Sequence, residues 1–185
     1  MIFILASKNR PQRKAFSLIL ALLMIFSCTM MSAMATRVHA ETPAEAVVED
    51  MEEFVPRTTA PKNNSYYTSK NAYYKCGYGM PNCTAYAYGR AYEILDSKPK
   101  LCMGNAYEWY GYNKQHKYYD YGKKPKLGAI CCWARGHVAV VEKIAGDKVT
   151  ISESHYSGRY FDTKTITKGN ESKYCGSFQG YIYIL

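Results

Sequence analysis

The amino-acid sequence predicts an α+β domain in which N-terminal helices pack on a mostly antiparallel sheet. Small and apolar residues recur at helical spacing after residue 82, which predicts a helix in the first half of the domain. After Pro125 the pattern changes to short β-branched or aromatic runs that are separated by glycines. Helices followed by consecutive strands with tight turns are typical of an antiparallel sheet covered by helices.

The composition is that of a chain that buries a core. Of its 185 residues, 48% are hydrophobic and 21% are charged. These fractions exclude collagen-like and wholly disordered chains, and the length indicates one ordinary domain with additional segments. The formal net charge of +9 and the 19 tyrosines are not spread evenly along the chain, so each segment has to be considered separately.

Residues 1–40 have the features of a secretory signal peptide. They contain five basic residues and no acidic one, an apolar run over residues 15–28, and small residues at Val38 and Ala40 just before Glu41. This pattern predicts cleavage after Ala40 and a secreted or cell-wall location. The alternative is an uncleaved signal anchor, because residues 15–35 carry no charge and are numerous enough to span a bilayer. Both interpretations place the rest of the chain outside the cytoplasm, and contact with a membrane is expected only for the second.

Residues 41–61 are predicted to form an acidic linker. Six acidic residues and no basic one lie between Glu41 and Pro56, and prolines interrupt the segment. Residues 62–185 then form the folded domain. With the basic signal and the acidic stretch up to Pro56 set aside, residues 57–185 carry a charge of about +10 and contain all 19 tyrosines. Such a charge attracts anionic partners.

The individual elements follow from local patterns. A helix is expected to begin at Cys83 and to run to about Asp96, with Asn82 as its N-cap. A second, shorter helix is expected from Asn105 to about Asn113. Strands are expected at residues 127–133, 137–144, 148–154 and 178–185, and tight turns join them into antiparallel pairs.

Three residues in this scheme have the chemistry of a cysteine hydrolase. Cys83 lies at a predicted helix N-terminus, where the helix dipole and unpaired N–H groups favour a thiolate. His137 opens an apolar strand directly after Gly136, so it is rigidly supported and still reachable as a base. The hairpin around residues 145–147 would return Glu153 to the neighbourhood of His137, where a carboxylate orients the imidazole and stabilises its cation.

Four segments of the sequence resemble the successive motifs of a CHAP domain, the cysteine, histidine-dependent amidohydrolase/peptidase module. They are Asn-Cys-Thr-Ala-Tyr-Ala-Tyr-Gly-Arg-Ala at 82–91, Lys-Leu-Gly-Ala-Ile-Cys-Cys-Trp at 126–133, Gly-His-Val-Ala-Val-Val-Glu at 136–142 and Ile-Ser-Glu-Ser-His-Tyr at 151–156. The resemblance covers residues 62–185 and implies a papain-like α+β fold. It also implies a secreted bacterial peptidoglycan hydrolase that cleaves an amide bond, as an N-acetylmuramoyl-L-alanine amidase or an endopeptidase.

The resemblance also implies roles for individual residues. Cys83 would be the nucleophile, His137 the base and Glu153 the residue that orients it, and the N–H group of Cys83 would contribute to the oxyanion hole. Asn82 stands where a glutamine often precedes the nucleophile, so it is a candidate second oxyanion donor. His155 occupies the position where many CHAP domains have an asparagine, and it is a candidate support for the base.

No metal or cofactor is expected. Some CHAP domains carry an Asp-rich calcium loop before the cysteine, but residues 66–82 contain no acidic residue. A zinc site has no support, because the sequence has no C-x-x-C pair and no histidine cluster at ligand spacing. Six cysteines follow Ala40, and if Cys83 is free the other five cannot all pair; the sequence leaves their connectivity open.

The expected partner is peptidoglycan or another anionic cell-wall polymer. Tyrosines interleaved with lysines would stack on sugar rings and attract such a polymer. Basic and aromatic residues also suit single-stranded nucleic acid, but export of the chain argues against that partner. We expect a monomer. The alternative function is a catalytically inactive, basic, tyrosine-rich wall-binding module on the same fold, and the sequence does not distinguish remodelling of the cell's own wall from attack on another cell.

Overall fold

The computed structural model describes residues 54–185. The predicted signal peptide and residues 41–53 of the predicted linker lie outside the described residues. Within residues 54–185, no helix combines the length and the hydropathy needed to cross a bilayer.

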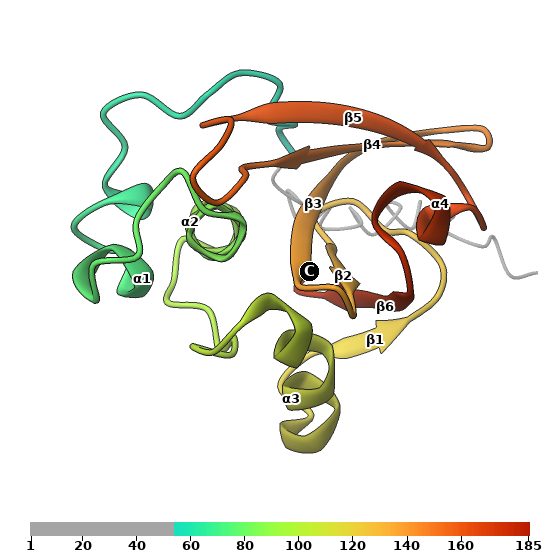
Figure 1. Cartoon of the computed structure of the whole chain (residues 1–185), viewed down its shortest axis with the longest axis horizontal. Coiled ribbons are helices and arrows are strands. Elements are labelled where there is room, and N and C mark those ends of the chain that lie inside the picture. The colour runs from blue at the N-terminus through green and yellow to red at the C-terminus, as the bar shows by residue number, and fades with distance from the viewer. Residues whose placement is uncertain (1–53) are drawn as a thin grey trace, which may run out of the picture. The chain divides into compact units, whose positions relative to one another are not determined.

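A six-stranded antiparallel sheet forms the centre of the domain, in the order β1-β6-β2-β3-β4-β5 (Figure 1). The strands are β1 (Asp120–Gly122), β2 (Ile130–Trp133), β3 (His137–Ala145), β4 (Lys148–Glu153), β5 (Asp162–Thr167) and β6 (Phe178–Tyr183). The four predicted strands correspond to β2, β3, β4 and β6, and the hairpin between β3 and β4 turns at residues 146–147. The α+β prediction is therefore confirmed. The expected tight turn into the last strand is wrong, because β5 and the helix α4 (Glu171–Cys175) follow β4, and β6 pairs with β1 and β2.

The two edge strands, β1 and β5, are not among the predicted ones. β5 buries only Ile166, and its other residues are exposed or half-buried. β1 has three residues and buries none of them. Because the prediction relied on apolar runs, an edge strand that pairs mainly through its backbone carries little sequence signal.

The helices are the 3₁₀ segments η1 (Ser65–Tyr67) and η2 (Ala106–Glu108) and the α-helices α1 (Ala72–Lys75), α2 (Cys83–Leu95), α3 (Trp109–His116) and α4 (Glu171–Cys175). Helix α2 begins at Cys83 and ends one residue before the predicted position, because Asp96 takes the left-handed conformation with φ 44°. The second predicted helix is divided into η2 and α3. Helix α4 was not predicted from the sequence.

The sheet has a different apolar core on each of its faces. Alternate residues of β2 and β3, among them Ile130, Cys132 and Val138, pack with the buried side of α2 and with Trp109 of α3. The intervening residues, among them Cys131, pack on the other face with Tyr174 and Cys175 of α4. Figure 1 shows α2 beside β3, and α4 near β5 and β6. Adjacent Cys131 and Cys132 therefore point to opposite faces, as expected for a strand.

Buried polar contacts fix α2 on the sheet. The Arg90 guanidinium donates hydrogen bonds to both carboxylate oxygens of Glu142 on β3, at 3.0 and 2.9 Å, and neither residue is exposed by more than 4%. Tyr86 donates to Ser152 Oγ on β4 at 2.7 Å. An unpaired buried charge is costly, so these pairs set the position of the helix along the sheet as well as its distance from it.

The last residues of the predicted linker lie against the domain. The backbone N–H of Arg57 donates to Glu142 at 2.8 Å, and Arg90 donates to the carbonyl oxygen of Val55 at 2.6 Å. The Arg57 side chain also pairs with Glu93 on α2. Residues 54–59 line a cavity of about 550 Å³ beside these contacts. The described end of the predicted linker, residues 54–61, therefore includes a docked segment, and its attachment to the domain begins before residue 62.

Candidate active site

Cys83 lies at the first position of α2, and its neighbours hold that end of the helix in place. Asn82 is the N-cap, and its side-chain oxygen accepts hydrogen bonds from the N–H of Thr84 at 3.0 Å and the hydroxyl of Thr84 at 2.8 Å. The Asn82 N–H donates to Ser154 Oγ, just after β4, at 3.1 Å. The Cys83 thiol lies 4.0 Å from the carbonyl oxygen of Gly136, beside the start of β3. Two segments, each more than 50 residues away from Cys83 in the sequence, thus position the predicted nucleophile.

His137 is the first residue of β3. It pairs with Trp133 across the hairpin, and the turn between them contains Gly136 at φ +90°, a conformation that favours glycine. The imidazole lies 5.7 Å from the Trp133 ring, measured between centroids, and is 8% exposed as a residue. The ring is therefore held between packed neighbours, and only a small part of it is exposed.

Glu153 is the last residue of β4 and is fully buried. The register places Val140 opposite Ser152, so Glu153 adjoins Ala139, and its side chain reaches diagonally to His137 on the same face. Glu153 Oε2 lies 2.6 Å from His137 Nε2. The hairpin thus brings the carboxylate to the imidazole, as the sequence pattern predicted.

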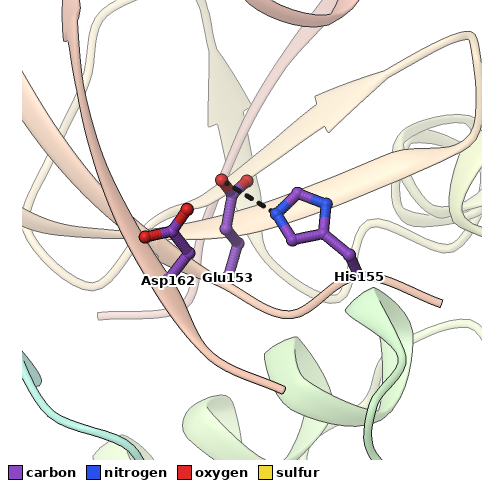
Figure 2. Close-up of side chains that lie close together, drawn as sticks. All are labelled: Glu153, His155 and Asp162. Carbon is purple, nitrogen blue, oxygen red and sulfur yellow. Dashed lines mark ion pairs between the residues drawn. The ribbon is translucent and has the colours of Figure 1, made fainter. Parts of the chain in front are cut away.

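The other oxygen of Glu153 also has partners. Tyr174 of α4 donates its hydroxyl to Oε1, and His155 Nε2 lies 3.4 Å from the same oxygen (Figure 2). The His155 ring also stacks on His137, with centroids 5.4 Å apart and planes 12° apart. His155, the predicted support for the base, therefore contacts His137 directly by ring stacking and indirectly through Glu153. Tyr174 was missed, and its only sequence signal is an aromatic residue in a segment where no helix was expected.

The electrostatics favour a cationic imidazole at His137, next to Cys83 and Glu153. Burial by itself lowers the pKa of His137, but hydrogen bonds with Cys83 and Glu153 and the attraction of both groups outweigh it and raise the pKa to about 9. Burial raises the pKa of Glu153, and this effect is outweighed by the hydrogen bonds from His137 and Tyr174, so the net shift is downward. Since Nε2 faces Glu153, Nδ1 is the ring nitrogen left to face Cys83. The structure therefore brings Cys83, His137 and Glu153 into one connected series.

Figure 2 shows three side chains with potential metal-ligand atoms, Glu153, His155 and Asp162, which lie close together. One ligand atom from each of Glu153, His155 and Asp162 lies within 4.8 Å of the others. Glu153 is already bonded to His137 and Tyr174, and Asp162 pairs with Arg159. A cation at this point would have to compete with those contacts, and their present effect is to hold the Glu153 carboxylate in place.

Cys83 opens into a cleft of about 760 Å³. Its wall contains exposed tyrosines at 78, 107 and 156, and Asn82 lies beside Cys83 in the same wall. The Asn82 oxygen is occupied by Thr84, which leaves the NH₂ group of Asn82 as a donor. All six cysteines of residues 54–185 are free, and Cys76 is the exposed one.

Comparison with known proteins finds a similarity to a described domain family over the residues of this site. The family model of the CHAP domain matches residues 73–155, a range that contains Cys83, His137 and Glu153, and it confirms the resemblance seen in the sequence motifs. No curated protein sequence matches the chain.

Solved structures that match include the crystal structure of Ly7917 and that of Ly7917 with the hydrolyzing product of MDP. They are 21% and 22% identical, each with a TM-score of 0.43 and 56% of this chain covered. The chain matches about half of their length, 53% and 54%.

Proposed function

We propose that the protein is a secreted peptidoglycan hydrolase that cleaves an amide bond through a covalent intermediate on Cys83. The observation that carries the proposal is the connected series of a cysteine at a helix N-terminus, a buried histidine and a fully buried carboxylate, donated by three different elements. The match of the CHAP family model over the residues of this series supports the reaction class.

The first half-reaction forms a thioester. The reactive form in this proposal is a Cys83 thiolate beside a His137 imidazolium, and the raised pKa of His137 supports the protonated imidazole. The thiolate attacks the carbonyl carbon, a C–S bond forms, and the π electrons move to the oxygen. The free N–H group at the first position of α2 and the NH₂ group of Asn82 are the donors at hand for this oxyanion. His137 gives its Nδ1 proton to the amide nitrogen as the C–N bond breaks, and an amine leaves.

In the second half-reaction, His137 acts as a base and Cys83 is the leaving group. The neutral imidazole takes a proton from water, and the resulting hydroxide attacks the thioester carbon. The C–S bond then breaks, which releases a carboxylic acid and restores the thiolate and the imidazolium. Glu153 remains ionised throughout and holds Nε2, because its two oxygens are fixed by His137 on one side and Tyr174 on the other.

The proposed substrate is peptidoglycan, with the cleaved bond either the amide between sugar and peptide or an amide within a peptide. A charge of about +10 on the domain suits an anionic polymer outside the cell. The exposed tyrosines at the cleft offer apolar faces for sugar rings. Mass analysis of the products distinguishes an amidase, which releases whole peptides from the sugar, from an endopeptidase.

The test is an assay of the exported protein on purified peptidoglycan, with new amino groups as the readout. We expect Cys83→Ser and His137→Ala to lose activity by at least about a thousandfold, because each lacks a group that makes or breaks a bond. Cys76→Ser is the matched control, since it removes an exposed thiol from the same cleft and should retain activity. Binding of all proteins without any product would support the alternative of an inactive wall-binding module, and equal activity of Cys83→Ser and the unmodified protein would exclude Cys83 as the nucleophile.

A further inference from the structure

Among residues 54–185, Arg135 is the only charged residue that lines the cleft around Cys83. The rest of the described wall is made of tyrosines, Met103, small residues and neutral polar side chains. No acidic side chain among residues 54–185 lines the cleft, so the charge that the wall itself contributes is that of one guanidinium. An anionic group on the bound molecule is the ligand that such a wall favours.

Arg135 has no carboxylate partner within residues 54–185, and this distinguishes it from the three other arginines of that range. Arg57 pairs with Glu93, Arg90 with Glu142, and Arg159 with Asp162. A guanidinium offers five donors in a planar fork that matches a carboxylate, and the Arg135 fork is exposed and available.

The position of Arg135 is fixed by the surrounding backbone. It lies in the turn between β2 and β3, two residues before His137, and that turn is tied to the segment before β6 by the bond from the Ala134 N–H to the Ser177 carbonyl at 2.9 Å. The side chain runs along Gly176, at φ +79°, where a Cβ atom would lie 2.6 Å from Arg135 Cδ and 2.9 Å from Nε. Glycine at 176 therefore makes room for the arginine stem and limits the directions that the guanidinium can take.

We propose that Arg135 binds a carboxylate of the substrate next to the scissile amide, so that the cleft selects peptides with a free acidic group at that place. This inference rests on the proposed function and narrows its substrate class. A bidentate pair would fix the peptide relative to a turn that also carries His137, and would therefore orient the carbonyl toward Cys83. Peptidoglycan peptides whose carboxylates have been converted to carboxamides lack the negative charge that this pair with Arg135 requires.

The experiment compares one batch of peptidoglycan before and after its carboxylates are converted to carboxamides with a carbodiimide and ammonium chloride. Initial rates of amino-group release are measured for the unmodified protein and for Arg135→Gln, Arg135→Lys and Lys164→Gln. Lys164 is exposed on β5, does not line the cleft, and its substitution removes the same net charge. We expect conversion to slow the unmodified protein and Lys164→Gln by at least about tenfold, the effect of one charge-assisted pair.

On native peptidoglycan, the initial rate of Arg135→Gln should be lower than that of the unmodified protein by a similar factor, and conversion of the carboxylates should lower this rate little further. The rate of Arg135→Lys on native peptidoglycan should lie between those of Arg135→Gln and the unmodified protein. The inference is overturned if Arg135→Gln is as active as the unmodified protein on native peptidoglycan, or if conversion slows both proteins by the same factor. In both cases the hydrolase proposal stands, because the unmodified protein is active. If the unmodified protein releases no amino groups from native peptidoglycan, the proposed function fails and the inference fails with it.

Discussion

Replacing Glu153 by glutamine tests the electrostatic link between the carboxylate and His137. The amide keeps the size of the side chain and an oxygen that can accept from Nε2, but it removes the negative charge 2.6 Å from the imidazole. With Glu153 in place, the pKa of His137 is raised from 6.5 to about 9. An opposite charge at such a distance is worth roughly 1–3 pKa units, so Glu153→Gln should lower the pKa of His137 by that amount.

Two measurements follow this change. The alkaline limit of kcat/KM on peptidoglycan, where the imidazolium is lost, should move down by the same 1–3 units, and NMR titration of the imidazole C–H protons should report the shift directly.

Stability provides an independent check. Because the pKa of His137 is raised by folding, its contribution is fully present below pH 6.5 and is lost as the pH rises through about 9.

The size of this loss follows from the shift itself. A change from 6.5 to about 9 corresponds to about 3 kcal/mol of unfolding free energy between the two ends of that window. Other groups titrate in the same range, so the informative quantity is the difference between the two proteins: Glu153→Gln should lose less stability than the unmodified protein between pH 6.5 and pH 9. An unchanged alkaline limit together with an unchanged imidazole titration would refute the assigned role of Glu153.

Four further substitutions test the site and the packing of the helices. Tyr174→Phe removes a donor to Glu153, so the pKa of that carboxyl should rise, the acid limit of kcat/KM should move to higher pH, and activity should fall by roughly tenfold at most, as measured in the same pH series. Arg90→Ala leaves Glu142 buried without its main cationic partner, and urea denaturation should show a loss of about 3–5 kcal/mol. Gly89→Ala should destabilise the domain by about 1–3 kcal/mol because its Cβ would meet Tyr67 at 2.7 Å, whereas Gly111→Ala, with nothing within 4 Å, should stabilise α3 by about 0.5–1 kcal/mol in the same denaturation assay. Equal effects of the two alanines would show that helix propensity, and not packing, controls these positions.

Local patterns were sufficient for the central elements of the site. The N-cap at Asn82 and the helical spacing after it determine where α2 begins, and therefore that Cys83 lies at a helix N-terminus. The turn at residues 146–147 folds β4 back along β3, and the alternation of a strand then places Glu153 near His137. These relations depend on hydrogen bonds and side-chain directions within a few residues or one hairpin, which is why a sequence can reveal them.

Contacts between segments that are distant in the sequence left no local pattern from which they could be predicted. Tyr174 belongs to a five-residue helix whose position under the sheet depends on packing, and its bond to Glu153 joins residues 21 apart. The docking of residues 54–59 also follows from a charge network that spans Arg57, Glu93, Arg90 and Glu142, because only the folded domain brings these residues together.

The sequence by itself determined the α+β class, the consecutive pairing of β2, β3 and β4, and the residues with nucleophile, base and carboxylate chemistry. Only the tertiary structure decided which oxygen of Glu153 faces the imidazole and which residue fixes the other oxygen. It also decided that Arg135 lines the cleft beside Cys83 with no carboxylate partner among residues 54–185. The physical reason is that an element's type is favoured by near neighbours in the chain, whereas the charge state of a buried group depends on every dipole and charge within a few ångströms, wherever in the sequence it originates.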